Sequence, residues 1–413
     1  MNLWLFRRSI MLVHAAAFVL LVCGAPAFAA DSQGKAKGEG THPLKGPARS
    51  PAKRQAESKM VIAYLFPQNT AIDPSTVAAR KVTRINYAFA NLKDGEMVEG
   101  FPHDAENLAA LNGLKRDNPA LTVVVSVGGW TWSGNFSDMA LTRRSRGRFI
   151  DSAVRFVEKY NLDGVDIDWE YPGIAGNNNK FRPEDKQNYT LLLMELRQRF
   201  DREGRRLGRH LVTSIATGAS HNFLAHTEMA KVQRYVETVN LMTYDYYLPG
   251  IDKTTGHDSP LLTNAADPRH VSADDSVRAF EEAGVSAGKI VLGVPFYGKT
   301  WGEVSSEDHG LFQPGKAVPG SHFSYGDVQG LLDDGYVRYW DTESAVPYLY
   351  SEQAHIFISY EDPESVARKC QYVTERRLGG VMFWEYFNDP SGALLDAIDA
   401  GLHGGETPRA EGR

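Results

Sequence analysis

From Met60 onward, the sequence alternates between short β-rich runs and amphipathic helical segments. We predict eight strands, at residues 61–66, 84–90, 121–127, 164–169, 211–217, 238–243, 290–295 and 380–384. The predicted helices between them include residues 144–159, 185–200, 273–283 and 364–377. Repeated strand–helix units are typical of a parallel sheet with helices on both faces. Eight units predict the α/β class and, within it, a TIM (β/α)8 barrel. A doubly wound open sheet is the alternative, although no Gly-x-Gly-x-x-Gly turn follows the first strand.

One long interval, residues 302–358, breaks this alternation. It is rich in Gly, Pro, Tyr and Ser, and it shows no pattern for a long helix. Because a loop of that length without structure is uncommon in a compact domain, we predict a small inserted α+β subdomain between the seventh strand and the seventh helix. It follows a strand, at the C-terminal face where barrel enzymes hold their sites, so we expect it to form one wall of a cleft.

The N-terminal residues have the pattern of an export signal. Arg7 and Arg8 precede an apolar run at residues 10–22, and Ala27-Phe28-Ala29 matches a small-residue cleavage site. We therefore expect a signal peptide at residues 1–29, with export to the periplasm or to the outside of the cell. An uncleaved anchor is the alternative, but the run is shorter than the roughly 20 residues that span a bilayer. After cleavage we expect no stable membrane insertion.

The remaining boundaries follow from composition. Residues 30–58 carry Gly, Pro, Lys and Ala with few large apolar side chains, which predicts a disordered linker. We expect the catalytic barrel at residues 59–403 and a C-terminal tail at 404–413. Loss of the signal peptide would remove Cys23 and leave Cys370, so no internal disulfide is expected and stability must come from a large core.

Several functional classes find no support in the composition. The net charge of −6 gives no electrostatic reason to expect nucleic acid as a partner. The 12 histidines include no His-Glu-x-x-His motif, and we expect neither a metal nor another cofactor. Residues 310–317 nearly match a phosphate-binding loop but end in Ala, with no predicted helix after them. We expect the protein to act as a monomer.

Residues 163–170 read Asp-Gly-Val-Asp-Ile-Asp-Trp-Glu, with apolar residues on one parity and acids on the other. Side chains of a strand alternate between its two faces, so Asp166, Asp168 and Glu170 would share one face. Buried carboxylates without partners are costly and normally become protonated. The pattern indicates a site that handles protons. A purely structural stack of hydrogen-bonded acids is the alternative.

This octapeptide resembles the catalytic signature of glycoside hydrolase family 18, the chitinases. Further segments resemble motifs of that family in the same order: Ser-Val-Gly-Gly-Trp at 126–130, Met-Thr-Tyr-Asp at 242–245, Gly-Val-Pro-Phe-Tyr-Gly at 293–298 and Gly-Gly-Val-Met-Phe-Trp-Glu at 379–385. Residues 336–340 and 347–350 resemble the inserted subdomain of bacterial members. The resemblance runs from about residue 61 to residue 402.

The resemblance implies a secreted chitinase that hydrolyses β-1,4 linkages between N-acetylglucosamine units. Members of this family retain the anomeric configuration and use the substrate's own acetamido group as the nucleophile. By analogy, Glu170 would be the general acid and then the base for water. Asp168 would bind the acetamido N–H, Asp166 would lie deeper and share a proton with Asp168, and Tyr244 would donate to the acetamido carbonyl.

The same resemblance implies a set of residues that contact the sugar. Trp384 would form the floor under the sugar at the scissile bond, because an aromatic face suits the C–H face of a pyranose ring. Asp245 would contact the sugar or its acetamido group. Arg338 matches a family arginine that contacts substrate, although it would instead pair with an acid of the insertion in the alternative reading. The other predicted contacts are Tyr64, Phe89, Gly129, Trp130 and Met242, with Trp132 and Tyr297 as further candidates.

Two other functions fit parts of this pattern. An endo-N-acetylglucosaminidase acting on glycoprotein or cell-wall glycans would use the same fold and acids. A non-catalytic chitin-binding lectin would use the same barrel, but such relatives typically lose the acid, and Glu170 is present here. The insertion favours a deeper cleft and a linear polymer as substrate. We expect endo action, with exo action as the alternative.

Overall fold

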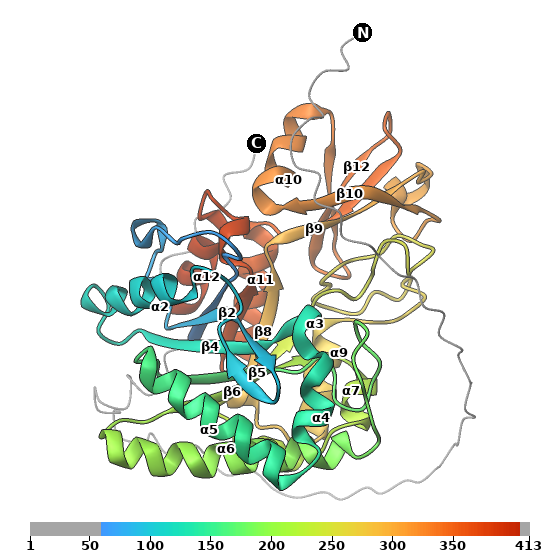
Figure 1. The fold of residues 1–413 in the computed structure, drawn as a ribbon. Coiled ribbons are helices and arrows are strands. Elements are labelled where there is room, and N and C mark those ends of the chain that lie inside the picture. The colour runs from blue at the N-terminus through green and yellow to red at the C-terminus, as the bar shows by residue number, and fades with distance from the viewer. Residues whose placement is uncertain (1–58, 405–413) are drawn as a thin grey trace, which may run out of the picture. The chain divides into compact units, whose positions relative to one another are not determined.

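A closed barrel of eight parallel strands forms the centre of the protein (Figure 1). The computed structural model describes residues 59–404, apart from the side chains of residues 320–322. The barrel strands, in sheet order, are β1 (Met60–Leu65), β2 (Arg84–Lys93), β4 (Thr122–Gly128), β5 (Gly164–Asp168), β6 (Val212–Gly218), β7 (Thr238–Met242), β8 (Ile290–Pro295) and β14 (Gly380–Trp384). Because β1 pairs in parallel with both β2 and β14, the sheet closes. The predicted TIM barrel is confirmed, and the open sheet is wrong.

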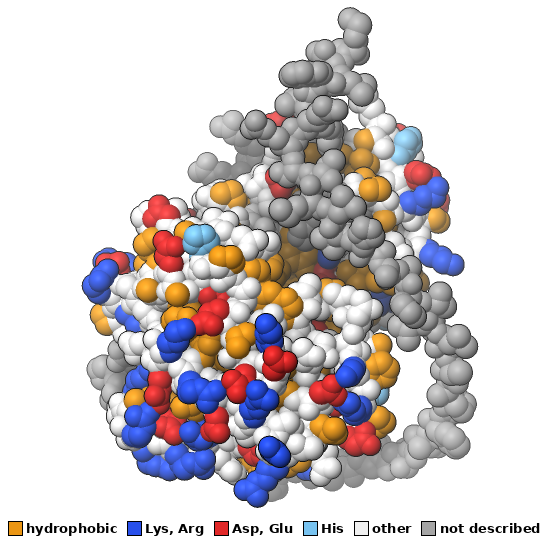
Figure 2. All heavy atoms as spheres, viewed as in Figure 1, with side chains coloured by type: hydrophobic (Ala, Val, Ile, Leu, Met, Phe, Trp, Pro, Cys, Tyr) orange, Lys and Arg blue, Asp and Glu red, His pale blue; other side chains and the backbone are white. Residues whose placement is uncertain are grey.

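Helices cover the outside of the barrel. The longer ones are α2 (Asp104–Gly113), α5 (Arg143–Lys159), α6 (Asp185–Leu207), α9 (Ala273–Glu282), α11 (Pro363–Glu375) and α12 (Ala393–His403). The short ones are α3 (Gly129–Trp132), α4 (Phe136–Ala140), α7 (His221–Ala225) and α8 (Met229–Val232). Charged side chains of both signs are spread over the α5 and α6 side of the molecule (Figure 2). Some of them join these two helices, as in the pairs Arg199–Asp151 and Arg206–Glu158.

Local sequence signals explain where several helices begin and end. Thr142 and Ser145 form a reciprocal capping box at the start of α5. Asp362 and Ser365 do the same for α11, where Pro363 occupies the first turn and needs no hydrogen-bond acceptor. The helix α6 runs beyond its predicted end at residue 200 and stops at Gly208, which adopts the left-handed conformation that favours glycine.

A second, antiparallel sheet follows β8, in the order β10-β9-β13-β12-β11. Its elements are β9 (Tyr297–Gly302), β10 (Lys316–Ser324), α10 (Tyr325–Leu331), β11 (Val337–Asp341), β12 (Val346–Ser351) and β13 (Ile356–Ser359). The predicted α+β insertion is present, but its sheet begins at Tyr297 rather than at residue 302. Only Phe296 separates β8 from β9, so one continuous motif in the sequence contributes to both sheets.

Two apolar cores lie beneath these sheets, and the main one also includes side chains of β12 and β13. The main core lies between the barrel strands and the surrounding helices, and it includes Val165 and Ile167 of β5. The second core contains Trp301, Tyr348 and Phe357 of the insertion together with Tyr247, from the loop after β7. The insertion therefore shares its core with a loop of the barrel.

Three parts of the predicted domain organisation fall outside the described residues: the signal peptide, the linker and residues 405–413. Between residues 59 and 404, no helix has the length and apolar character needed to cross a membrane.

Candidate active site

Three carboxylic acids lie along β5 and just past its end. Asp166 and Asp168 belong to the strand, and Glu170 is the second residue after it. The side chains are buried to different depths, with exposed fractions of 0% for Asp166, 3% for Asp168 and 8% for Glu170. The strand therefore carries its acids from the barrel interior to the C-terminal rim, as the alternation in the sequence predicts.

Asp166 is the deepest acid, and four donors surround its carboxyl group. Ser214 Oγ (2.6 Å) and Asn240 Nδ2 (3.3 Å) donate to Oδ1. Ser126 Oγ (2.8 Å) and Tyr64 Oη (3.0 Å) donate to Oδ2. Burial raises the pKa of Asp166, and the hydrogen bonds from the two serines and Tyr64 oppose that rise. The sequence prediction did not assign Ser214, Asn240 or Ser126 a role, although each is a polar residue within a barrel strand.

Asp168 lacks such partners. Its Oδ1 is buried and has no hydrogen-bond partner among the residues that the structure describes. Burial raises the pKa of Asp168 well above its usual value, and the charges of Glu170 and then Asp166 raise it further. The predicted sharing of a proton between Asp166 and Asp168 stays a prediction, and the effect of the Asp166 charge on the pKa of Asp168 agrees with two carboxyl groups that lie near each other. Asp168 is a buried acid free to bind an incoming polar group.

Glu170 lies at the rim with a fixed backbone. Its N–H donates to Ser133 Oγ (2.8 Å), and that hydroxyl donates in turn to the carbonyl of Gly129 (2.9 Å). Burial raises the pKa of Glu170 to about 7, a hydrogen bond with Tyr171 opposes the rise, and the charge of Asp245 adds to it. A carboxyl group that titrates near neutral pH can both give and take a proton.

Two glycines at the end of β4 allow this arrangement. Gly128 has a φ of +112°, and a Cβ there would lie 2.2 Å from the carbonyl oxygen of Asp168. Gly129 has a φ of +74°, and its Cβ would lie 2.7 Å from the ring of Phe89. Both positions need glycine for conformation and for space. Gly129, which was predicted to contact substrate, lies beneath Phe89. Because it has no side chain, its backbone can approach that ring closely.

Trp384 ends β14, and its half-buried ring rests on other aromatic rings. Phe89 stacks on it with centroids 5.5 Å apart and an interplanar angle of 23°. Phe66 and Tyr64 lie 5.5 Å and 5.9 Å away. Tyr64 is only 2% exposed, and its hydroxyl is used by Asp166. The contact of Tyr64 with substrate stays a prediction, and the described contacts show that its ring packs against Trp384.

A row of rings continues from Trp384 along the rim. Phe66 lies 5.8 Å from Phe101, and Phe101 lies 4.9 Å from Trp132. Trp130, in the same short helix as Trp132, is 52% exposed. Both tryptophans were predicted as candidates for the cleft, whereas Phe66 and Phe101 were not. The faces of these aromatic rings suit the apolar C–H faces of sugar rings.

Tyr244 and Met242 come from the end of β7. Both pack in a small cluster with Trp384, which brings them to the same rim as the acids. Tyr244 also meets Tyr297 edge to face, at a centroid distance of 6.2 Å. Burial, followed by the charge of Asp168, raises the pKa of Tyr244 well above its usual value, so its phenol remains a hydrogen-bond donor at neutral pH.

Asp245, the next residue, is held from the insertion. Tyr297 Oη donates to its Oδ1 (2.8 Å), and Lys299 Nζ forms an ion pair with the same oxygen (2.7 Å). Both partners lie on β9. Lys299 was not predicted, because only the fold brings its side chain on β9 beside Asp245.

Arg338 does not join this group through any described contact. Its guanidinium donates to Asp362 (2.7 Å) and Glu364 (2.8 Å), at the start of α11. The predicted contact with substrate finds no support in this geometry. The alternative, pairing with an acid inside the insertion, has the wrong partners, because Asp362 and Glu364 lie beyond residue 358.

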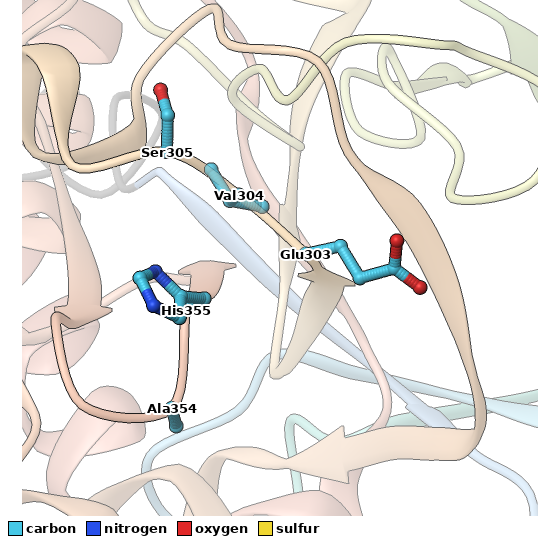
Figure 3. A pocket seen from close by; sticks show the side chains of 5 residues that line it. All are labelled: Glu303, Val304, Ser305, Ala354 and His355. Atoms are coloured by element: carbon cyan, nitrogen blue, oxygen red, sulfur yellow. The ribbon is translucent and has the colours of Figure 1, made fainter.

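A shallow hollow of about 460 Å³ lies on the inserted subdomain (Figure 3). Glu303, Val304, Ser305, Ala354 and His355 line it. None of the predicted site residues lines this hollow, so the chemistry of the acids belongs elsewhere, at the rim of the barrel. Residues 59–404 also contain no cluster of His, Cys, Asp and Glu suited to a metal ion.

Known proteins resemble this chain in sequence. Residues 60–389 match the family described as glycosyl hydrolases family 18. The chain is 42% identical over 319 residues to "Chitinase A1" of Niallia circulans, a match that covers 73% of this chain and 46% of that protein. It is 30% identical over 426 residues to "Chitinase B" of Serratia marcescens, which covers 83% of each.

A solved structure matches this chain at the same sequence identity as the Niallia chitinase. A glycoside hydrolase family 18 N-acetylglucosaminidase from Paenibacillus barengoltzii superposes with a TM-score of 0.76 and 42% identity. That match covers 83% of this chain and 100% of the other. The present chain spans about half the length of the Niallia chitinase.

Proposed function

The chain belongs to glycosyl hydrolases family 18, and from that premise we propose that it is a secreted chitinase. It hydrolyses β-1,4 linkages between N-acetylglucosamine units and retains the anomeric configuration. The observation that carries this proposal is the convergence of Asp168, Glu170, Tyr244 and Trp384 at the C-terminal rim of one barrel. The similarity to proteins named chitinases supports the choice of substrate.

In the first step, Glu170 gives its proton to the glycosidic oxygen while the bond from that oxygen to C1 breaks. The carbonyl oxygen of the 2-acetamido group attacks C1 and forms a bicyclic oxazolinium ion. Glu170 suits this role because its pKa of about 7 leaves much of it protonated at neutral pH. Trp384 supplies the aromatic face beneath the reacting ring.

Two other groups act on the acetamido group. Asp168 has a buried Oδ1 that no group within residues 59–404 hydrogen-bonds, and the acetamido N–H would satisfy it. A hydrogen bond there turns the acetamido oxygen toward C1 and stabilises the positive charge that develops. The Tyr244 hydroxyl donates to the same oxygen and holds its orientation.

In the second step, water attacks C1 and opens the oxazolinium ring. Glu170, now ionised, takes a proton from that water and returns to its starting state. The two inversions at C1 give net retention. Because the nucleophile belongs to the substrate, a fully de-acetylated chain should be cleaved far more slowly than the acetylated one. Equal rates on the two polymers would falsify substrate-assisted catalysis.

Product analysis by mass spectrometry tests the substrate class. We expect an N-acetylglucosamine hexasaccharide to be cut to shorter oligomers, while a cellulose hexasaccharide stays intact. Cleavage of neither, by a folded protein, would contradict the proposal and favour glycoprotein or cell-wall glycans as substrates.

A second candidate is release of single N-acetylglucosamine units. The Paenibacillus N-acetylglucosaminidase favours it, because the match covers that whole chain at 42% identity. The same mass spectra separate the two candidates. Trimer and dimer as early products support endo action, whereas monosaccharide alone supports the second candidate.

Export and monomeric state also belong to the proposal. The pattern of Arg7, Arg8 and the apolar run at 10–22 supports a cleaved signal peptide. N-terminal sequencing of the exported protein should begin near residue 30. Its retention in the cytoplasm with Met1 intact would contradict export, and gel filtration of the mature protein should give a monomer.

A further inference from the structure

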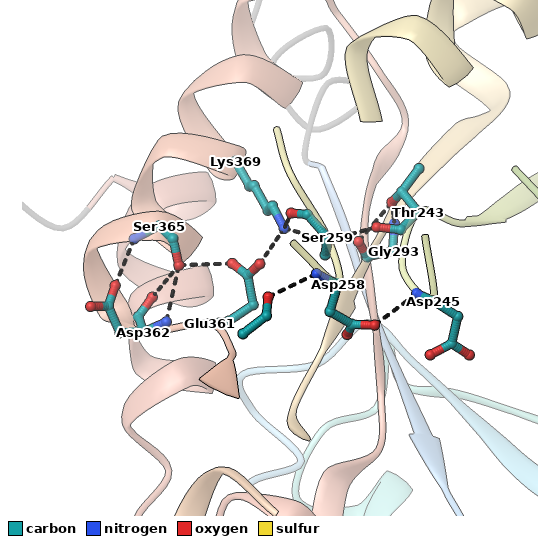
Figure 4. A network of polar contacts seen from close by, with 10 residues as sticks. Thr243, Asp245, Asp258, Ser259, Gly293, Glu361, Asp362, Ser365 and Lys369 are labelled. Atoms are coloured by element: carbon teal, nitrogen blue, oxygen red, sulfur yellow. Dashed lines mark hydrogen bonds and ion pairs between the residues drawn. The ribbon is translucent and has the colours of Figure 1, made fainter. Parts of the chain in front are cut away.

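Two residues of the loop after β7, Asp258 and Ser259, hold the backbone on both sides of Tyr244. Ser259 Oγ donates to the carbonyl of Thr243 (2.5 Å), the residue before Tyr244. The N–H of Asp245, the residue after it, donates to Asp258 Oδ1 (3.0 Å). The position of the tyrosine is therefore set by groups 14 or more residues further along the chain, as Figure 4 shows.

Thr243 is also tied to the neighbouring strand. Its Oγ1 donates to the carbonyl of Gly293 on β8 (2.7 Å) and accepts the N–H of the same residue (2.9 Å). The side chain of Thr243 is thus fixed by β8, while its carbonyl is fixed by Ser259. Of these contacts, only the one from Ser259 to the Thr243 carbonyl comes from a residue outside the barrel sheet.

Lys369, on the inner side of α11, anchors Ser259. The side chain is 0% exposed, and its Nζ donates to Ser259 O (2.7 Å), Ser259 Oγ (2.6 Å) and Glu361 Oε1 (2.6 Å). All three ammonium protons are used, and Ser365 Oγ satisfies the second oxygen of Glu361 (2.7 Å). Ser259 Oγ accepts a hydrogen bond from Lys369 and donates its own proton to the Thr243 carbonyl. The hydrogen bonds therefore run in one direction, from Lys369 through Ser259 to Thr243.

A lysine is a costly choice at this position. Burial lowers the pKa of Lys369 and raises that of Glu361, because each charge leaves water, and their mutual contact opposes both shifts. Replacing a buried ion pair by apolar residues is often neutral for stability or even favourable. On the buried face of α11, Val366 and Val373 are apolar, whereas Ser365 belongs to the same polar network as Lys369. Packing alone therefore does not explain the ammonium group.

We propose that Lys369 is a positioning residue for the hydrolysis reaction. It holds Ser259, Ser259 binds the Thr243 carbonyl, and this chain of contacts fixes the position of Tyr244. The inference rests on the proposed function, because it assigns Tyr244 a role in orienting the acetamido group. The described hydrogen bonds of the Lys369 ammonium group go to Ser259 and Glu361, and none joins it to Tyr244.

The test is a double-mutant cycle on the N-acetylglucosamine hexasaccharide. Lys369→Met is made together with Glu361→Gln, so that no lone carboxylate is left buried, and folding is checked by circular dichroism. We expect kcat to fall at least tenfold while KM changes less than threefold. In a Tyr244→Phe background the same pair of substitutions should reduce kcat less than twofold, because the group being positioned is already absent.

A second variant, Ser259→Ala, removes the bridging hydroxyl and leaves the ion pair in place. It should show the same fall in kcat with little change in KM, and it keeps the test possible if the double variant does not fold. Lys289→Met is the matched control, since that lysine also donates to two backbone carbonyls, of Gln233 and Val236, but at the start of β8. It should keep the kcat of the unmodified protein. A wild-type kcat in Ser259→Ala, or an equal loss with and without the Tyr244 hydroxyl, would overturn the proposal.

Hydrogen exchange separates this inference from the proposed function. Amide exchange in the segment 243–259 needs no substrate, and we expect it to be at least tenfold faster in Ser259→Ala than in the unmodified protein. If the unmodified protein cleaves no oligosaccharide, the proposed function fails while this measurement still tests the anchor. Unchanged exchange would show that Lys369 and Ser259 do not position the segment.

Discussion

At the scale of single residues, three acids of one short segment differ because their surroundings differ. Asp166 has four donors, Asp168 has a buried oxygen without a hydrogen-bond partner among the described residues, and Glu170 lies at the rim, where burial and then the charge of Asp245 raise its pKa. Sequence spacing predicted their common direction. It did not predict these different partners, which come from Tyr64, Ser126, Ser214 and Asn240 on other strands.

The first prediction concerns the pH dependence of the reaction. Glu170 must be protonated to act as the acid, so kcat/KM should fall as pH rises through about 7. Asp245→Asn removes a negative charge that raises the pKa of Glu170, and the alkaline limb should move to lower pH. Rate profiles between pH 4 and 9 measure this. The control, Asp399→Asn on α12, should leave the limb in place, and a shift of the Asp245 variant to higher pH would contradict the assignment.

The second prediction concerns stability. Glu170 has a folded-state pKa of about 7, above the value of about 4.5 expected when unfolded, so the unfolded chain loses this proton first. The free energy of unfolding therefore decreases as pH rises from about 4.5 to 7 and stays reduced above that. Glu170→Gln should stabilise the protein at pH 8, by at most about 3 kcal/mol, and leave it unchanged at pH 4. Chemical denaturation at the two pH values measures this, and equal effects at both would argue against a buried, raised carboxyl group.

At the scale of elements, the strand and helix positions followed from hydrophobic periodicity, while boundaries and long-range contacts did not. The segment at 293–298 reads as one motif, yet it contributes to β8 and to β9 in different sheets. Lys299 and Ser259 gave no signal, because a single lysine or serine in a loop is ordinary until the fold places it beside Asp245 or Thr243. The pairing of Arg338 with Asp362 at the start of α11 also gave no signal in the sequence, and its contact with substrate stays a prediction.

The third prediction concerns the turn after β4. In Gly128→Ala the new methyl group would lie 2.2 Å from the carbonyl of Asp168, at a φ of +112°. We expect a loss of about 2–4 kcal/mol of stability and at least a tenfold fall in kcat, because relief of the clash displaces Asp168. Thermal unfolding and kinetics measure both. Gly134→Ala is the control, since a Cβ there meets nothing within 4 Å. A Gly128 variant as active and stable as this control would exclude the tight contact.

At the scale of the whole molecule, the barrel and its insertion cooperate through shared packing. Tyr247, three residues beyond Tyr244, belongs to the core of the inserted sheet. Tyr297 and Lys299 of the same sheet hold Asp245. The insertion was predicted as the wall of a cleft. That role stays a prediction, whereas its described contacts show that it braces the loop that carries part of the candidate site.

The fourth prediction tests this bracing. Trp301 is fully buried in the insertion's core, and Trp301→Ala should cost that core about 3–5 kcal/mol. We expect faster hydrogen exchange in residues 297–359 and in the loop around Tyr247, with kcat reduced and the exchange of β4 and β5 unchanged. Phe149→Ala, in the main core, is the contrast and should speed exchange in the barrel. An intact kcat despite a loosened insertion would show that the loop does not depend on it.

The most direct test of the account is the turnover number of Glu170→Gln on an N-acetylglucosamine hexasaccharide, measured beside the unmodified protein and an exposed control, Glu106→Gln. Removal of the acidic proton should lower kcat by about 10²–10⁴-fold, with KM nearly unchanged, because Gln keeps the shape of the side chain but cannot protonate the leaving oxygen. The Glu106 variant should match the unmodified protein. A Glu170→Gln protein that turns over at the wild-type rate would show that the acid lies elsewhere and that the proposed active site is wrong.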